Sequence, residues 1–457
     1  MAPSRLALDA NDALATRIGR HGLADGELAG LESRAQAAHE HLAGLRAAGN
    51  LGWWGLPGDA SIVDPAIALG EELKDKFENV VVLGIGGSSL GPKAVISALA
   101  GPFHNLQATG KRKGARVFFP DNSDPATFAA LLAELDLGKT CFLAVSKSGG
   151  TAETLAQLLV VRERCGGKLA DRVIAITDPE KGALRKIATA EGWRTLPVPP
   201  KVGGRFSVLT AVGLVPIAAA GVDARAVCAG AEAMRVRCEE PALRKNPAYF
   251  LAGIHYLFDT AKGRRIQVLF PYADALRDVG DWWVQLWAES LGKNPGVGPT
   301  PVRAVGATDQ HSMLQLLMEG PEDKLVTFVA VADRGAPLPL PAAWTEHAEL
   351  AYLGGKTMAK LIDAERRGTA GALAEAGRPS LAITLPRIDG KAVGELLFLW
   401  ETATAYAGAL YGVDPFDQPG VEASKKITQG LLGRKGAEGH AAKLLARPAP
   451  DPAYVID

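Results

Sequence analysis

Short apolar runs alternate with helix-like stretches along most of the chain. Apolar runs that fit buried strands occur at residues 79–85, 116–120, 140–145, 172–177, 265–270, 324–331 and 380–385. Stretches of helical composition separate them, including residues 208–221, 247–261 and 273–292. Alternation of helices with strands that are apolar throughout predicts parallel sheets covered on both faces. We therefore expect an α/β fold with two alternating halves.

Helical segments flank these halves. Residues 5–49 are rich in Ala, Leu, Arg and Glu and predict a helical lead-in, whereas residues 393–445 predict helices interrupted at residues 414–420. The proline-rich residues 336–341 predict a linker or surface loop. The expected organisation is a helical N-terminal segment, two α/β domains and a helical tail, at residues 1–50, 51–240, 241–425 and 426–457.

Composition and charge limit the classes of partner. The 457 residues are 47% hydrophobic and 22% charged, which is typical of a soluble globular protein. Fifty basic residues balance 50 acidic ones, so no overall charge attracts nucleic acid or an anionic membrane. No stretch approaches the ~20 apolar residues of a membrane span, and the N-terminus lacks a signal-peptide core. The sequence predicts neither a nucleic-acid nor a membrane partner.

The four cysteines lack the spacing of metal ligands. No CxxC pattern is present, and four cysteines in a chain of this length favour a reducing, cytoplasmic setting with structural thiols. We expect no metal and no redox cofactor. The four positions are Cys141, Cys165, Cys228 and Cys238.

A polar turn follows the apolar run at residues 140–145. The first N–H groups of the helix after it have no intrahelical partner, so an anion fits there, and Ser146, Ser148 and Thr151 add hydroxyl donors. The turn is not a Walker loop, because Lys147 precedes the glycines instead of following them. The pattern predicts a phosphate cradle. The alternative is that a Ser/Gly turn only caps the helix.

Two further glycine-rich steps point to the same ligand. Residues 86–92 follow the strand at residues 79–85, and the carboxyl ends of parallel strands meet at one edge of a sheet. Both turns can therefore converge on one ligand. Arg205 follows two glycines and precedes an apolar helix, which favours an anion-facing arginine over a solvated surface charge.

Three residues are candidates for proton transfer. Gln285 and Glu289 share a helix face, and a glutamate near the tryptophans of that helix loses hydration, which suits a general base. His311 lies in a polar turn, and imidazoles exchange protons near neutral pH. Lys425 follows residues 418–422. Alternatively, Glu289 is an ordinary solvated helix residue and His311 is a surface histidine. Lys425 and Lys426 then belong to a solvent-exposed helix face.

Six segments together resemble the glucose-6-phosphate isomerase family. They occur in family order over roughly residues 80–430, so their combination is far more specific than one glycine-rich turn. The segments are GIGGSSLGP (84–92), SKSGGTAET (146–154), VGGRFSVLTAVGLV (202–215), QLWAES (285–290), GATDQHSM (306–313) and GALYGVDPFDQPGVEASKK (408–426).

The resemblance implies two sugar-isomerase (SIS) domains and reversible isomerisation of glucose 6-phosphate and fructose 6-phosphate, in glycolysis and gluconeogenesis, without a cofactor. It implies that Glu289 is the base, that His311 and Lys425 serve ring opening, and that Arg205 is near the enediolate. It further implies homodimers in which the neighbouring subunit supplies His311. The implied substrate-binding residues are Gly87, Ser88, Ser146, Lys147 through its amide, Ser148, Thr151, Gly204, Gln285 and Gln418.

Some positions differ from the longer animal members. Ser148, with the two glycines after it, and Ser89 replace other residues of that form and resemble compact bacterial members. These differences leave the preference for glucose over mannose at C2 open. A non-catalytic sugar-phosphate sensor is a further alternative, which the joint presence of Glu289, His311 and Lys425 disfavours. The remaining alternatives are an isomerase that also accepts mannose 6-phosphate and a protein in which the cradle-like turn has no ligand.

Overall fold

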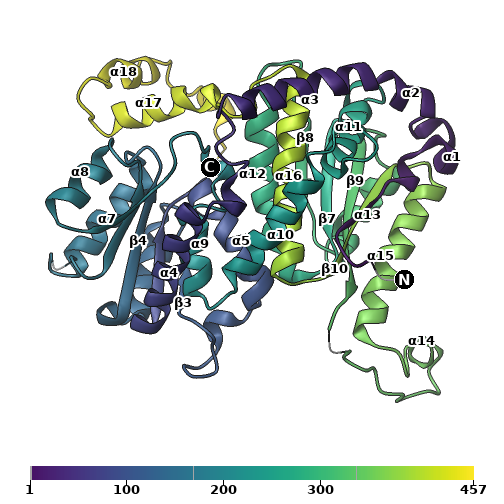
Figure 1. The fold of residues 1–457 in the computed structure, drawn as a ribbon, viewed down its shortest axis with the longest axis horizontal. Coiled ribbons are helices and arrows are strands. Elements are labelled where there is room, and N and C mark those ends of the chain that lie inside the picture. Colours follow the sequence, from purple (N-terminus) through teal and green to yellow (C-terminus); the bar gives the residue numbers. More distant parts are fainter. Residues whose placement is uncertain (1–2, 168, 336, 457) are drawn as a thin grey trace.

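The computed structural model describes residues 3–167, 169–335 and 337–456. Within these residues, two five-stranded sheets form the frame (Figure 1). The first sheet has the order β3-β2-β4-β5-β6, and all of its strands are parallel. Its strands are β2 (Asn79–Leu83), β3 (Arg116–Phe118), β4 (Thr140–Ser146), β5 (Val173–Thr177) and β6 (Arg194–Pro197).

The second sheet has the order β1-β10-β9-β7-β8. Four of its strands are parallel, and β1 joins the edge antiparallel to β10, with Leu8 opposite Ile383. Its strands are β1 (Ala7–Asp9), β7 (Ile266–Pro271), β8 (Thr300–Arg303), β9 (Lys324–Asp333) and β10 (Ser380–Arg387).

A layer of helices separates the two sheets and forms one continuous core with their inner faces. Alternate residues of β4 point to opposite faces: Leu143 and Val145 join this central core, whereas Phe142 and Ala144 face the outer helices. The central helices are α4 (Ala60–Lys76), α5 (Leu90–Ala100), α9 (Ala211–Ala219), α10 (Ala224–Arg237), α11 (Pro247–Thr260), α12 (Arg277–Leu291) and α16 (Gly390–Tyr411).

Outer helices cover the remaining face of each sheet. On the first sheet they are α6 (Pro125–Glu134), α7 (Ala152–Arg164) and α8 (Ala183–Ala190), and on the second α13 (Gln310–Glu319) and α15 (Met358–Glu375). Because helices cover both faces, every residue of β2, β4 and β5 is buried.

The other helices lie at the ends of the chain and on a projecting segment. In Figure 1, α3 runs across one end, α14 lies on the projection, and α17 and α18 lie above α7 and α8. Their bounds are α1 (Ala15–Ile18), α2 (Asp25–Gly30), α3 (Glu32–Ala47), α14 (Ala348–Ala351), α17 (Glu422–Leu431) and α18 (Glu438–Leu445). In the described part of the chain, no helix has the length and apolar character needed to cross a membrane.

The expected α/β class is confirmed, and a strand occurs at each of the seven apolar runs. The helical expectation for residues 5–49 is wrong over Ala7–Asp9, which form β1. The edge strands β6 and β8 were not expected, because both are partly exposed and carry no apolar run. Residue 336 of the expected loop lies outside the described residues, and residues 337–341 are largely exposed. The three boundaries between the four expected segments stay a prediction.

Candidate active site

Arg205 lies at the centre of the candidate site, in the 3-10 turn Gly204–Phe206. Its side chain is 2% exposed, yet each of its five N–H groups has an acceptor. Nε donates to Ser290 Oγ at 2.7 Å, Nη1 to Glu289 Oε2 and Gln418 Oε1 at 3.1 Å each, and Nη2 to the carbonyl oxygens of Pro415 at 2.5 Å and Asp417 at 2.9 Å. The guanidinium is therefore fixed in both position and orientation.

The charge of Arg205 is compensated from several directions. Burial lowers the pKa of Arg205, and the carboxylates of Glu289, Asp417 and Asp414 oppose that change. A guanidinium remains protonated in proteins, and a buried one requires charged or hydrogen-bonded partners. The site therefore holds a permanent cation against a carboxylate, which is the arrangement needed to stabilise a developing anion.

Glu289 lies in the last turn of α12, and its two carboxylate oxygens have different donors. Oε2 accepts from Arg205, and Oε1 accepts from Gln285 Nε2 at 3.3 Å, one helical turn earlier. The shared face of Gln285 and Glu289 is thus confirmed. The Glu289 side chain is 32% exposed, whereas Trp283 and Trp287 are fully buried in the central core. The hydrogen-bonding partners of Glu289 are Arg205 and Gln285, and its side chain remains partly exposed.

The first glycine-rich turn packs directly against this pair. A Cβ at Gly87 would lie 2.2 Å from the carbonyl atoms of Gly204, and one at Gly86 would lie 2.8 Å from Gln285 Nε2. Gly86 also has a φ of +59°, which favours glycine. Ser88 ends the same 3-10 turn and is half-buried. Glycine at position 87 lets the turn pack against the backbone of Gly204, and glycine at position 86 fits the positive φ of the residue beside Gln285 of α12.

The second turn lies between β4 and α7, at the carboxyl edge of the first sheet. The hydroxyl groups of Ser146 and Thr151 form a hydrogen bond with an Oγ–Oγ1 distance of 2.8 Å. The Gly150 amide donates to Ser148 Oγ at 3.3 Å. Thr151 is the residue before α7, yet its side chain makes no capping bond to the helix. This argues against a turn that only caps α7, because the first N–H groups of the helix still lack a side-chain acceptor.

Lys147 connects the second turn electrostatically to Arg205. Burial lowers the pKa of Lys147, Asp178 opposes that change, and the charge on Arg205 adds to it. The positive charges of Lys147 and Arg205 therefore repel each other. An anion between them would relieve this repulsion.

His311 and Lys425 lie apart from the Arg205–Glu289 pair. His311 occupies the exposed first turn of α13. Lys425 lies on α17 with a side chain that is 54% exposed, and it pairs with Glu422 at 2.9 Å. Across the residues that are described, no hydrogen bond or ion pair joins either side chain to Arg205 or Glu289. Their chemical roles stay predictions.

Two further residues of the site, Ser290 and Lys293, were not predicted from the sequence. Ser290 is fully buried and accepts the Nε–H of Arg205, 85 positions away. Lys293 donates from Nζ to Asp417 Oδ1 at 2.8 Å, 124 positions away. Ser290 follows Glu289 directly, but no local pattern identifies partners so distant in the sequence.

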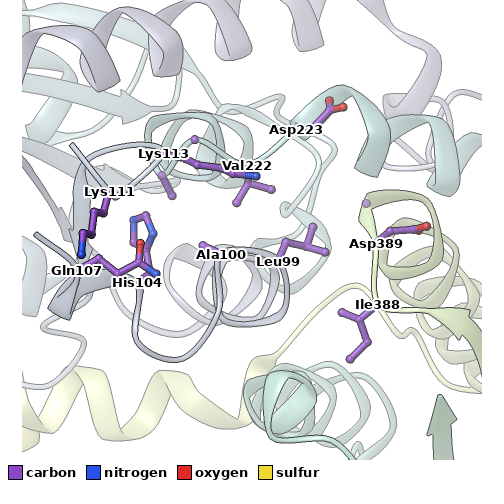
Figure 2. Close-up of a pocket in the computed structure, with 13 residues that line it drawn as sticks. Leu99, Ala100, His104, Gln107, Lys111, Lys113, Val222, Asp223, Ile388 and Asp389 are labelled. Carbon is purple, nitrogen blue, oxygen red and sulfur yellow. The ribbon is translucent and has the colours of Figure 1, made fainter. Parts of the chain in front are cut away.

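A cavity of about 430 Å³ lies elsewhere, beside the starts of α10 and α16 (Figure 2). Lys111, Lys113 and His104 lie on one side of it, and Asp223 and Asp389 lie on the other. Both aspartates already cap their own helices, at Ala226 N and Ala392 N. None of the candidate catalytic residues lines this cavity.

Metal-ligating side chains do not gather within the described ranges: no group of three or more His, Cys, Asp or Glu residues is placed to hold an ion there. The four cysteines are free thiols. Burial raises the pKa of Cys141, Cys228 and Cys238 to about 12, which keeps these three protonated and unreactive.

Sequence comparison finds relatives that extend over nearly the whole chain. The family model for phosphoglucose isomerase matches residues 69–442. A glucose-6-phosphate isomerase from Carboxydothermus hydrogenoformans is 40% identical over 467 residues, covering 99% of this chain and 100% of its own. A glucose-6-phosphate isomerase from Rubrobacter xylanophilus is 45% identical over 391 residues, covering 84% of this chain and 90% of its own.

Structural comparison agrees. A hypothetical protein from Thermus thermophilus superposes with a TM-score of 0.82 at 36% identity, covering 94% of this chain and 100% of its own. A glucose-6-phosphate isomerase from Chlamydia trachomatis superposes with a TM-score of 0.72 at 25% identity, covering 84% and 76%. From the family match, the relatives and the shared fold, the chain belongs to the phosphoglucose isomerase family.

Proposed function

We propose that this chain interconverts glucose 6-phosphate and fructose 6-phosphate. Membership of the family and the names of its relatives support this substrate class. The observation that carries the proposal is the 3.1 Å contact between a buried guanidinium and a partly exposed carboxylate, Arg205 and Glu289. A proton shuttle beside a fixed cation is what an aldose–ketose isomerisation through an enediolate requires.

The phosphate binds at the carboxyl edge of the first sheet. Donors for it are the hydroxyls of Ser146, Ser148 and Thr151, the Lys147 amide and the free N–H groups at the start of α7. The turn with Gly87 and Ser88 lies between this cradle and the sugar. Gly204, Gln285 and Gln418 line the sugar itself.

Glu289 then moves one proton between the two reacting carbons. Its carboxylate removes the proton from C2 of the aldose and returns it to C1, so one base on one face of the sugar is sufficient. The enediolate formed between these steps carries negative charge. Arg205 stabilises that charge through Nη1, whose two N–H groups donate to Glu289 and Gln418 in the structure. When substrate oxygens take the place of Glu289 and Gln418 as acceptors of Nη1, the carboxylate of Glu289 becomes available to accept the substrate proton.

Ring opening needs an acid for the ring oxygen and a base for the anomeric hydroxyl. We assign these roles to His311 and Lys425, with His311 supplied by the second subunit of a homodimer. Its exposed position on α13, apart from Glu289 of the same chain, supports this arrangement. We place the reaction in the cytoplasm, in agreement with the four free thiols.

The decisive experiment is incubation with fructose 6-phosphate and a metal chelator in heavy water. We expect glucose 6-phosphate with deuterium at C2, because the proton on Glu289 exchanges with solvent before it is returned. Absence of any aldose phosphate would overturn the proposal. Mannose 6-phosphate in a parallel reaction measures how strictly the configuration at C2 is selected.

A further inference from the structure

Lys293 lies two residues beyond the end of α12, and its side chain is only 10% exposed. Its Nζ donates to two oxygens of Asp417, the side-chain Oδ1 at 2.8 Å and the backbone carbonyl oxygen. Holding a mostly covered lysine side chain in one conformation costs hydration and side-chain entropy, and these two bonds offset that cost. The contact fixes Asp417 to the end of the helix that carries Glu289.

The backbone carbonyl of Asp417 also accepts a hydrogen bond from Arg205. Arg205 Nη2 donates to it at 2.9 Å and to the carbonyl of Pro415 at 2.5 Å. Residues 414–418 form neither helix nor strand; within the segment, the Phe416 amide donates to Asp414 Oδ1 at 2.8 Å, and the Phe416 ring packs against Phe206. A segment without regular structure takes its position from side-chain contacts. Lys293 supplies such a contact at the carbonyl that Arg205 uses.

The acceptors around Arg205 divide into two groups. Ser290 Oγ and the two carbonyls of the segment 414–418 engage Nε and Nη2, and they leave Nη1 for Glu289 and Gln418. Gln418 belongs to the same segment. A shift of this segment would therefore rotate the guanidinium and move a sugar-lining side chain together.

We propose that Lys293 is a positioning residue of the isomerisation: it anchors the segment 414–418 so that Arg205 presents Nη1 to the reacting carbons. This inference rests on the proposed function, in which Arg205 stabilises the enediolate. Lys293 acts through Arg205 and does not contact the substrate.

The test replaces Lys293 with methionine, which keeps the length of the side chain and removes its charge and donors. We expect kcat for fructose 6-phosphate to fall about 10- to 100-fold, since a misplacement of about 1 Å has effects of that size, with KM changed less than about threefold. Lys293→Arg retains the charge and donors and should recover part of the loss. Asp417→Asn, a milder change that keeps the backbone carbonyl, should reduce kcat less than Lys293→Met.

Lys324 provides a matched control. Its side chain is also 10% exposed, and it likewise bonds a carboxylate and a carbonyl, those of Asp323 and Pro321, at the start of β9. Lys324→Met should leave kcat within about twofold of the wild type, because it touches no residue of the site. All assays are run well below the unfolding temperature of each variant, so that lost stability does not appear as lost kcat.

A double-mutant cycle separates positioning from a purely structural role. In an Arg205→Lys background, Lys293→Met should reduce kcat less than about threefold further, because its effect passes through the guanidinium. An equal reduction in both backgrounds, or a Lys293→Met enzyme with wild-type kcat, would overturn the inference. Failure of the proposed function is a different result, since the wild-type chain itself would then form no aldose phosphate.

Discussion

Two pairs of residues with proposed catalytic roles contrast sharply in this chain. Arg205 and Glu289 come from different segments, yet the fold brings their side chains to 3.1 Å, and each makes further hydrogen bonds, Arg205 to Ser290 and Glu289 to Gln285. His311 and Lys425 lie on exposed helix turns, and Lys425 has Glu422 as its ion-pair partner. One chain therefore brings together the pair proposed for proton transfer, whereas the two residues proposed for ring opening lie apart from it.

The largest expected effect tests the assembled pair. Glu289→Gln should lower turnover on the order of 10³-fold while sugar-phosphate binding stays nearly unchanged, because the amide cannot accept the proton. Steady-state kinetics and calorimetric binding of a hexose phosphate measure the two quantities. Glu319 is the matched control, since Gln315 donates to it one turn earlier on α13, as Gln285 does to Glu289. Normal turnover in Glu289→Gln would remove the base assignment.

Arg205→Ala should lower kcat about 10²-fold or more, and affect KM less, because the lost charge stabilises the enediolate more than the substrate. Stability should fall as well, since the acceptors that the guanidinium satisfied lose their donor. Arg264, with a side chain 4% exposed and paired with Glu322 at 2.7 Å, is the control. We expect Arg264→Ala to lose stability and keep its turnover; equal kcat for both variants would contradict the role of Arg205.

The cradle should respond in binding more than in turnover. Ser146→Ala removes a buried hydroxyl from the proposed phosphate site and should raise KM about tenfold with kcat little changed, the usual scale for one hydrogen bond to a charged group. Inhibition by inorganic phosphate should weaken in parallel. Ser380→Ala, a buried serine of β10 in the second sheet, is the control. Unchanged KM and phosphate inhibition in Ser146→Ala would place the phosphate elsewhere.

The smallest effect tests whether the site is shared between chains. Glu289→Gln and His311→Ala are each expected to be inactive alone. In a homodimer that shares its sites, mixing and reassociating them gives hybrids with one intact site, so random pairing should restore about a quarter of the wild-type activity. Size-exclusion chromatography monitors the reassociation. If His311 acts within its own chain, the hybrids stay inactive and the contrast between the two pairs disappears.

Local sequence patterns predicted what depends on neighbouring residues. The buried runs of β2, β4 and β5 and the turn after β4 were recognisable because apolar continuity and glycine-hydroxyl composition are local properties. The three-residue β1 and the partly exposed β8 were missed, because the formation of an edge strand depends more on pairing with its neighbour than on its own amino-acid composition.

The site shows the same division. Glu289 and Arg205 were predicted by segments that resemble the family, and their contact is visible in the structure. Ser290 and Lys293 were missed, since their importance arises only from Arg205 and Asp417, far away in the chain.

The antiparallel pairing of β1 with β10 imposes an order on folding during synthesis. The first sheet is contained within residues 79–197, so its strands leave the ribosome close together. Leu8 instead pairs with Ile383, which at about 5–20 residues per second emerges roughly 20 to 75 s later. Strand β1 therefore remains without its partner β10 during most of translation. A nascent chain should form the first sheet well before β1 completes the second sheet.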